Sequence, residues 1–362
     1  MILRRQGASR AVGDADLSEY VKAHEVAIAR KRVLITGAGG SIGSALAHAV
    51  ATHGPEALVL VDFSEQALYQ IDREIGAPHR AILADVCDEV ALDATFEHWR
   101  PQIVFHAAAF KHVPLMESHP FAAVRNNTVG SFTLARAAVR HGAEQVVIVS
   151  TDKAVEPASI MGASKRIAEL AALALASPAT RVKAVRMGNV YGSQGSVVPL
   201  FEGQIAQGGP VTVTHADATR YFLSLDEAAE YLLIALADDF PSGLLVPELA
   251  EPVRVEEIAR ELIEKSGSGA GISYIGLRPG EKLHEKLLAE DESFEGGVAR
   301  PLRVIRSRRI SADEAERVIH DLQAAIAMRD VGRLVDVVMR LVPSYKPSDT
   351  VLGQRAAAGC RA

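Results

Sequence analysis

Three consecutive residues carry groups that can exchange protons. Thr151, Asp152 and Lys153 supply a hydroxyl, a carboxyl and an amine, and Lys165 follows further along the chain. A carboxyl and an amine held side by side can act as acid and base in one reaction. An isolated Asp-Lys pair is more often a solvated loop pair, so its place in the fold must decide. Met161, between the two lysines, has a thioether that neither gives nor takes a proton near neutral pH.

The elements around these residues follow a regular alternation. From Arg32 onward, short β-branched runs alternate with helical periodicity, which predicts an α/β fold: a Rossmann-like, doubly wound parallel sheet with crossover helices. A cofactor is expected across the carboxyl ends of the strands, and Thr151 follows the fifth one. The predicted strands are 33–36, 57–61, 81–84, 103–106, 145–150 and 182–186.

A glycine-rich turn after the first predicted strand indicates dinucleotide binding. The string Thr36-Gly37-Ala38-Gly39-Gly40-Ser41-Ile42-Gly43 lets backbone amides and a helix N-terminus approach a pyrophosphate. Asp62 ends the second strand, where a carboxylate would bind the ribose hydroxyls, and this favours NAD over NADP. The alternative is that Asp62 caps the helix starting near Ser64. Both roles are compatible.

Two further strand ends are expected to line the cofactor. Asp85 and Val86 follow the third strand, and Ala107, Ala108 and Ala109 follow the fourth. Small residues there would let the cofactor pass close to the backbone, although ordinary strand-to-helix packing would also explain them.

The domain division is predicted from where the alternation decays. We expect a discontinuous substrate-binding lobe beside the cofactor domain, because Gly- and Pro-rich segments follow Arg186. The predicted parts are an N-terminal extension (1–30), an NAD-binding domain (31–190, with 222–245 returning to it), a substrate lobe (191–221 and 246–300), C-terminal helices (301–345) and a polar tail (346–362).

Composition excludes several classes of protein. The 362 residues include 39 basic and 45 acidic ones, without a long basic block, so no nucleic-acid partner is expected. With only Cys87 and Cys360, and no zinc-type His or Cys spacing, we expect neither a disulfide framework nor a metal site. The apolar runs are too short to span a membrane and no secretory signal is recognised, so a cytoplasmic protein is expected.

Several strings together carry a family resemblance. The chain resembles an extended short-chain dehydrogenase/reductase, and more narrowly the nucleotide-sugar 4,6-dehydratases of the bacterial polysaccharide-biosynthesis family. Many relatives carry an N-terminal membrane portion. No such portion is recognised in this sequence, so it resembles the soluble form of that family. The strings are Leu34 to Gly43, His106-Ala-Ala-Ala-Phe-Lys-His-Val-Pro-Leu-Met-Glu117, Ser150-Thr-Asp-Lys-Ala-Val155, Met161-Gly-Ala-Ser-Lys165, Asn189-Val-Tyr-Gly-Ser193 and Arg278-Pro-Gly-Glu-Lys282.

Two positions depart from the patterns of relatives. Met161 stands where a short-chain dehydrogenase normally has the Tyr of Tyr-x-x-x-Lys, and Gln194 stands where relatives often have Arg. The first departure requires another proton-transfer group, for which Thr151, Asp152 and Lys153 are the candidates. The second puts part of the substrate pocket in doubt.

The resemblance implies a reaction and a role for each residue. Tightly held NAD takes hydride from C4 of the sugar, water leaves across C5 and C6, and hydride returns to C6. Lys153 would be the C5 base, Asp152 the acid toward the C6 oxygen, and Thr151 the partner of the C4 oxygen. Lys165 would bind ribose hydroxyls. A base role requires the pKa of Lys153 to be lowered by burial or nearby positive charge.

The resemblance also implies substrate contacts. Arg220 and Arg278 would bind the diphosphate through their guanidinium forks, although a surface arginine is the commoner case. His112 would line the sugar side together with Glu117, although it could equally be a packing residue. The remaining assignments are Asn189, Val197, Glu117 and Glu281 to the substrate, and Lys111 and Asn126 to the cofactor.

The sequence thus predicts an NAD-dependent dehydratase acting on a nucleotide-linked N-acetylhexosamine, most simply UDP-N-acetylglucosamine, for surface-glycan synthesis. Alternatives are a GDP-linked substrate, inversion at C5, a 4-epimerase, or a non-catalytic NAD-binding regulator. The epimerase normally uses the Tyr that this chain lacks. A homo-oligomer, dimeric or larger, is expected.

Overall fold

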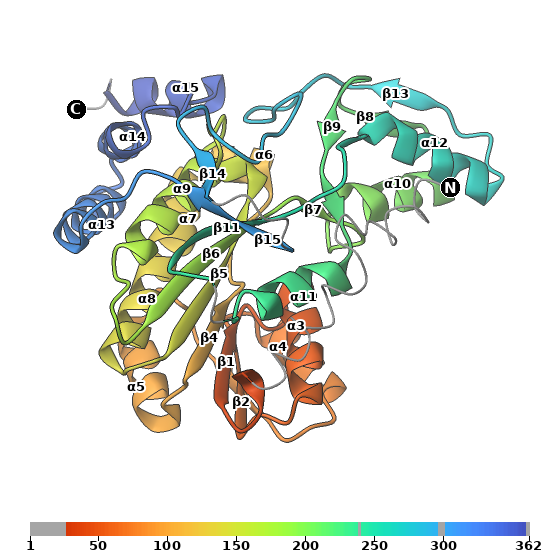
Figure 1. The fold of residues 1–362 in the computed structure, drawn as a ribbon. Coiled ribbons are helices and arrows are strands. Elements are labelled where there is room, and N and C mark those ends of the chain that lie inside the picture. Colours follow the sequence, from red (N-terminus) through yellow and green to blue (C-terminus); the bar gives the residue numbers. More distant parts are fainter. Residues whose placement is uncertain (1–26, 238–239, 296–300, 360–362) are drawn as a thin grey trace.

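The computed structural model describes residues 27–237, 240–295 and 301–359. The predicted N-terminal extension, residues 1–30, falls almost wholly outside them. The described residues form a central nine-stranded sheet in the order β14-β15-β11-β6-β5-β4-β1-β2-β3 (Figure 1). Seven of these strands run parallel: β1 (Arg32–Thr36), β2 (Ala57–Asp62), β3 (Arg80–Leu83), β4 (Ile103–His106), β5 (Gln145–Thr151), β6 (Arg181–Met187) and β11 (Gly243–Pro247).

This sheet confirms the predicted fold class. The six predicted strands correspond to β1 through β6, and each boundary agrees within one residue. The strand order reverses between β1 and β4, so their carboxyl ends diverge around a crevice. β1 shows why the strand forms, because Val33 and Ile35 pack into one hydrophobic cluster and Leu34 into another. Alternate side chains therefore face opposite layers of the molecule.

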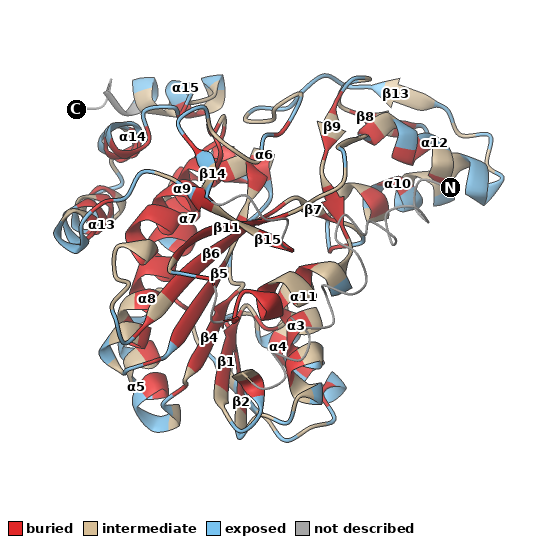
Figure 2. Ribbon diagram, in the orientation of Figure 1, coloured by how far each residue is buried: buried red, intermediate tan, exposed pale blue. Residues whose placement is uncertain are grey.

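Helices cover both faces of the sheet (Figures 1 and 2). One layer contributes buried apolar residues from α3 (Ser41–Thr52), α4 (Glu65–Glu74) and α11 (Leu225–Ile234). The other is built from α5 (Glu89–Trp99), α8 (Ser131–Arg140) and α9 (Ile160–Leu173). α11 packs against α3, so a segment late in the sequence lies beside the glycine-rich turn's helix.

A smaller group of elements stands beside the sheet (Figure 1). It has its own apolar cluster, which includes Phe201, Val211 and Ile258. Its helices are α10 (Val197–Ala206) and α12 (Val255–Ser266). Its short strands pair as β7 (Asn189–Val190) with β10 (Phe222–Leu223), β8 (Val211–Val213) with β13 (Ile272–Tyr274), and β9 (Thr219–Arg220) with β12 (Val253–Arg254).

The C-terminal part differs from prediction in two places. Helices were expected from residue 301, but Leu302–Arg306 forms strand β15, which pairs antiparallel with β11 and with β14 (Ser293–Glu295). Leu302 and Ile305 are buried there. α13 (Ala312–Ala327) and α14 (Val331–Leu341) then follow. The predicted polar tail is also wrong, because Asp349–Gly359 forms helix α15, whose Val351 is buried against Val331 and Val335.

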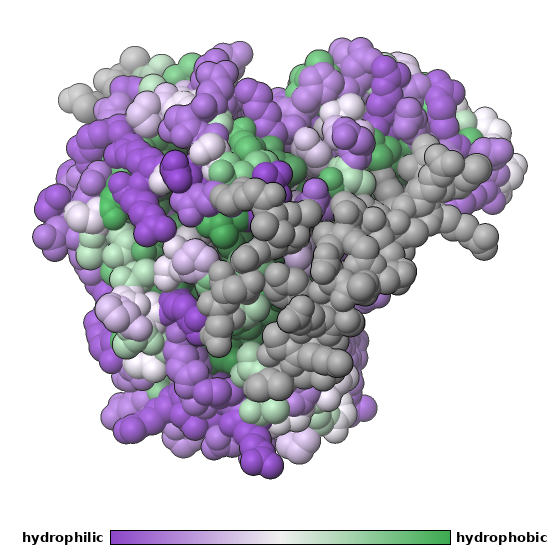
Figure 3. Space-filling view, in the orientation of Figure 1, coloured by the Kyte–Doolittle hydropathy of each residue, from purple (hydrophilic) through white to green (hydrophobic). Residues whose placement is uncertain are grey.

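Hydrophilic residues cover most of the face in Figure 3, and hydrophobic ones gather toward its middle. Within the described ranges, every helix is too short or too polar to cross a bilayer.

Candidate active site

The glycine-rich turn between β1 and α3 leaves no room for side chains. Gly37 has φ +66°, and a Cβ there would lie 2.5 Å from the amide nitrogen of Ala108. A Cβ on Gly43 would lie 2.0 Å from the carbonyl oxygen of Gly37. Only glycine satisfies both positions. The turn therefore brings the N-terminus of α3 directly to the crevice, where an anionic pyrophosphate would be stabilised.

Asp62, at the end of β2, holds this turn. Its Oδ2 accepts a hydrogen bond from the amide of Gly39 at 3.0 Å, and its Oδ1 accepts one from the amide of Ser64 at 2.9 Å. The N-cap of α4 is Ser64, whose hydroxyl accepts from Ala67. Ser64 rather than Asp62 therefore caps α4. The Asp62 carboxylate lines the crevice.

Most of the residues assigned to the cofactor line one cavity. Those that do are Gly37, Gly39, Gly40, Asp62, Ser64, Val86, Ala107, Ala108, Ala109 and Asn126. Phe63 and Gln194 also line it, although Phe63 was not predicted. The assigned residues outside the lining are Ser41, Ile42, Gly43, Asp85, Lys111 and Lys165. Asp85 instead pairs with Arg125 at 2.9 Å.

One loop of the smaller lobe lies against the glycine-rich turn. The amide of Gln194 donates to the hydroxyl of Ser41 at 3.0 Å, and Lys111 donates to the hydroxyl of Ser193 at 3.1 Å. The ring of His112 packs on Gly195, where a Cβ would lie 2.6 Å from its Cε1. These contacts favour the packing role for His112. They also place Ser41 and Lys111 at the joint between the cofactor crevice and the lobe.

His106 joins the carboxyl ends of β1 and β4. Its Nδ1 lies 2.7 Å from the hydroxyl of Thr36 and its Nε2 lies 2.8 Å from the hydroxyl of Ser131. Ser131 donates its own proton to the carbonyl of Asn127, so His106 donates through Nε2 and accepts through Nδ1. Burial, together with the charge of Lys165, lowers the pKa of His106 to about 3.

Thr151, Asp152 and Lys153 meet at the end of β5, where the short 3-10 helix η2 (Asp152–Ala154) begins. Asp152 Oδ1 accepts from the hydroxyl of Thr151 at 2.9 Å and from the amine of Lys153 at 3.0 Å. Asp152 is fully buried, and its Oδ2 accepts no hydrogen bond from the described residues. The three groups therefore form a continuous hydrogen-bonded chain at the carboxyl end of β5, and ligands of open α/β sheets bind at this edge.

The pKa of Lys153 is shifted in the opposite direction to the one expected for a base. Burial alone would lower the pKa of its amine, but the nearby carboxylates of Asp152 and Glu285 outweigh that effect and raise it. Lys153 also donates to Asn189 Oδ1 at 2.8 Å, which places Asn189 in the cluster. Nothing in the sequence pattern singled out Glu285, because it lies far along the chain in the loop after β13.

Helix α9 brings Met161 and Lys165 beside this cluster. A Cβ on Gly162 would lie 2.2 Å from the carbonyl oxygen of Lys153, so glycine lets the first turn of α9 touch η2. Met161 is buried, as its apolar side chain requires. Lys165 donates to the carbonyl of Val149 at 2.6 Å, and burial lowers its pKa to about 8 although Glu169 opposes the shift.

Glu117 has a different place from the one expected. It lies in α6 (Val113–Ser118), is fully buried, and accepts a hydrogen bond from the amide of Ile160, the first residue of α9, at 2.7 Å. Its second oxygen accepts from the hydroxyl of Ser348. With both oxygens engaged inside the protein, Glu117 stabilises the start of α9 and does not face a sugar.

The two arginines assigned to the diphosphate lie in different surroundings. Arg220 is buried and donates to the backbone carbonyls of Thr219, Lys282 and Leu283. It thereby fixes the loop that carries Glu285. Arg278 is about half exposed and pairs with Glu281 at 2.6 Å. Arg278 is accordingly the freer of the two guanidinium groups. Val197 begins α10, beside the Gln194 loop.

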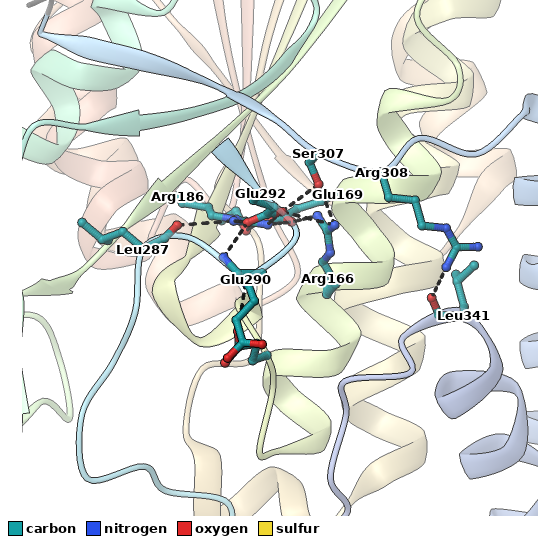
Figure 4. A network of polar contacts seen from close by, with 12 residues as sticks. Arg166, Glu169, Arg186, Leu287, Glu290, Glu292, Ser307, Arg308 and Leu341 are labelled. Atoms are coloured by element: carbon teal, nitrogen blue, oxygen red, sulfur yellow. Dashed lines mark hydrogen bonds and ion pairs between the residues drawn. The ribbon is translucent and has the colours of Figure 1, made fainter. Parts of the chain in front are cut away.

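A buried ionic network joins Glu292, on the segment that returns from the smaller lobe, to strand β6 of the sheet (Figure 4). Arg186 on β6 is fully buried and pairs with Glu169 of α9 at 2.8 Å and with Glu292 at 2.5 Å. Arg166 contacts both carboxylates, at 2.8 and 3.3 Å. Two positive and two negative side chains thus neutralise one another, which such burial requires.

Comparison with known proteins extends these observations. Residues 33–304 match the family described as polysaccharide biosynthesis protein. The capsular polysaccharide biosynthesis protein CapD of Staphylococcus aureus is 41% identical over 276 residues, or 73% of this chain. The chain spans only 46% of CapD. A UDP-glucose 4-epimerase of Rickettsia typhi is 34% identical over 72% of this chain and 79% of its own length.

Solved structures support the same fold. Pen from Bacillus thuringiensis superposes with a TM-score of 0.72 at 28% identity, covering 82% of this chain and 98% of Pen. MoeE5, solved with UDP-glucose and NAD, superposes with a TM-score of 0.61 at 25% identity, over 72% of this chain and 89% of MoeE5. The overall arrangement of helices and strands is therefore shared with these two solved structures.

Proposed function

The chain belongs to the polysaccharide biosynthesis protein family, and from that premise we propose that it is an NAD-dependent nucleotide-sugar 4,6-dehydratase. Its substrate is a nucleotide-linked N-acetylhexosamine, with UDP-N-acetylglucosamine the first choice. One observation carries the proposal above all: Lys153 and Asp152 are hydrogen-bonded at 3.0 Å beside the buried, proton-inert Met161. Elimination of water needs a base and an acid together, and this pair provides both.

The residues of the crevice fit NAD. The side-chain-free turn at Gly37 and Gly43 and the N-terminus of α3 suit a pyrophosphate, and the Asp62 carboxylate suits ribose hydroxyls. A 2′-phosphate beside Asp62 would meet like charge. The cofactor of this chain is therefore NAD, as in MoeE5. When bound, it supplies hydride transfer, taking hydride from C4 and returning it to C6.

The hydrogen-bonded chain accounts for the protons of the reaction. As C4 is oxidised, the hydroxyl of Thr151 accepts the O4 proton and passes its own proton to Asp152 Oδ1, 2.9 Å away. Asp152 then donates that proton to the C6 oxygen, which leaves as water. The nearby carboxylates raise the pKa of Lys153, so its amine must first release a proton to solvent before it can act as a base. The neutral amine then takes the proton from C5 and returns one to C5 after hydride reaches C6. Protons and electrons balance within one turnover.

The neighbouring residues position these groups. Asn189 accepts from the Lys153 amine at 2.8 Å, which orients it. Lys165, which donates to the carbonyl of Val149 and whose pKa is lowered to about 8 by burial, would bind the ribose hydroxyls. Arg278 and Glu281 stand at the lobe face, where Arg278 would bind the diphosphate.

Proton NMR of the protein with UDP-N-acetylglucosamine in deuterated water tests this function. We expect a growing C6 methyl signal with deuterium at C5. Conversion to a C4 epimer without a methyl signal would instead establish an epimerase. An epimerase is the second candidate because the Rickettsia typhi relative is a UDP-glucose 4-epimerase. Retained NAD with no turnover of UDP- or GDP-linked sugars would favour a regulator.

A further inference from the structure

A second buried carboxylate faces the Lys153 amine from another part of the chain. Glu285 Oε1 lies 3.8 Å from Lys153 Nζ, and the Glu285 side chain is only 3% exposed. Its other oxygen, Oε2, receives no hydrogen bond from the described residues and lies 3.5 Å from Lys282 Nζ. Lys282 also donates to the carbonyl of Val155 at 2.6 Å. Asp152, Lys153, Glu285 and Lys282 therefore alternate in charge along one row, in which the two carboxylates are buried and the two amines are partly buried.

The row is held by elements of both parts of the molecule. Arg220 of β9 fixes the backbone of Lys282 and Leu283, and Asn189 of β7 fixes the Lys153 amine. The charged groups that face Lys153 are thus Asp152 from its own turn, Glu285 and Lys282 from the loop after β13, and Arg220. Because the two carboxylates are buried and the two amines only partly exposed, water screens these charges less than it would at the surface.

We propose that Glu285 and Lys282 are positioning residues that set how readily Lys153 gives up its proton, and so the pH range in which C5 proton transfer proceeds. This inference rests on the proposed function of Lys153 as a base. Glu285 favours the cationic amine, which cannot act as a base, whereas Lys282 opposes it. The lobe therefore takes part in the chemistry through charge as well as through substrate contacts.

Two variants of opposite charge change should shift the reaction in opposite directions. Glu285→Gln removes a negative charge, so Lys153 loses its proton more easily and the acidic limb of the kcat profile moves roughly one pH unit lower. Lys282→Met removes a positive charge, so the limb moves higher. Glu285→Asp keeps the charge and should restore most of the parent profile. Glu290→Gln, on an exposed residue of the same loop, should leave the profile unchanged.

A second readout does not require turnover. Labelling of Lys153 by an amine-reactive reagent, followed by peptide mass spectrometry between pH 7 and 10, reports the neutral amine directly. We expect about tenfold faster labelling in Glu285→Gln and slower labelling in Lys282→Met. Shifts in the same direction for both variants, or none in Lys153 labelling, would overturn the inference. Opposite labelling shifts without any dehydration would retain the charge effect and reject the proposed function instead.

Discussion

At the scale of single residues, Lys153 and Asp152 derive their chemistry from being bonded to each other. A lysine and an aspartate on the surface would each be solvated and nearly inert. Here Asp152 is fully buried, and its Oδ1 accepts hydrogen bonds from the Thr151 hydroxyl and the Lys153 amine. The sequence places these residues together, but only the fold removes the water from them.

Replacing Lys153 by Ala should abolish dehydration while the protein still holds NAD. The base at C5 is lost, for which a decrease of roughly 10²–10⁴ in rate is typical. Lys153 does not line the cofactor cavity, so bound NAD is expected to remain. Turnover by NMR and NAD content by absorbance check this. Dehydration near the parent rate would contradict the base assignment.

Met161→Leu is the matched control for that variant. Met161 is buried and only fills space, and a change of similar volume usually costs less than about 1.5 kcal/mol. Activity should persist. A folded but inactive Met161→Leu protein would show that the sulfur has a direct role.

His106 should make the protein sensitive to acid well above the range of carboxylates. Its pKa falls from 6.5 to about 3 on burial, so the folded state holds it neutral. Above pH 6.5 neither the folded nor the unfolded chain binds this proton, so the free energy of unfolding keeps its full value. As pH falls from 6.5 toward 3, the unfolded chain binds the proton more readily than the folded one, so the free energy of unfolding decreases. Histidine ¹⁵N NMR should show His106 not titrating between pH 7.5 and 4.5. Titration near 6.5 in the folded protein would contradict this.

At the scale of elements, the start of α9 depends on contacts from distant parts of the chain. Ser159 caps the helix, Glu117 accepts from Ile160, and Ser348 donates to Glu117. Gln354 of α15 donates to the backbone carbonyl of Glu117 at 3.0 Å. Ser348 and, from α15, Gln354 thus stabilise the start of the helix that carries Met161 and Lys165, through their hydrogen bonds to Glu117.

Ser348→Ala should therefore destabilise the protein. Burial raises the pKa of Glu117, although Ser348 and Ile160 oppose the shift, so losing Ser348 leaves a poorly satisfied carboxylate. A loss of about 1–3 kcal/mol in the free energy of unfolding is expected. Denaturant titration measures it, with Ser293→Ala, at an exposed position of β14, as the control. Equal stability of both variants would rule out this support for α9.

The same elements show what the sequence could reveal. β1 through β6 and the glycine-rich turn follow from local periodicity and spacing, so they were predicted closely. The position of Glu285 beside Lys153 was not predictable, because no local pattern relates the loop after β13 to the end of β5. Glu117 matched a family string yet is buried under α9. α15 was missed because Val351 is nearly alone among its residues in being buried.

At the scale of the whole molecule, the network around Arg186 joins the returning chain to the core. Glu292→Ala would leave the fully buried Arg186 with one carboxylate partner instead of two. Breaking such a buried pair typically costs about 3–5 kcal/mol. Thermal unfolding should show the loss. An exposed pair, such as Arg355 with Asp336, provides the comparison and should cost under about 1 kcal/mol.

The network also adds a second acid-sensitive range. Burial would raise the pKa of Glu169, but Arg186 outweighs it and lowers the pKa to about 2. The stability from this carboxylate is fully present above pH 4.5 and is lost as pH falls from there toward 2. Free energies of unfolding at a series of pH values should decline below 4.5 less steeply in Arg186→Met than in the parent. Parallel declines would contradict this.

The antiparallel pair β14 and β15 has a consequence for the order of folding. These strands complete the central sheet beside β11, yet they follow the lobe in the chain. Contacts between residues so distant in sequence form slowly, because long loops must close first. A growing chain therefore carries an unfinished sheet edge until residue 306 has been made. We expect chaperones to bind nascent chains that end before β15, and to release them once it is added.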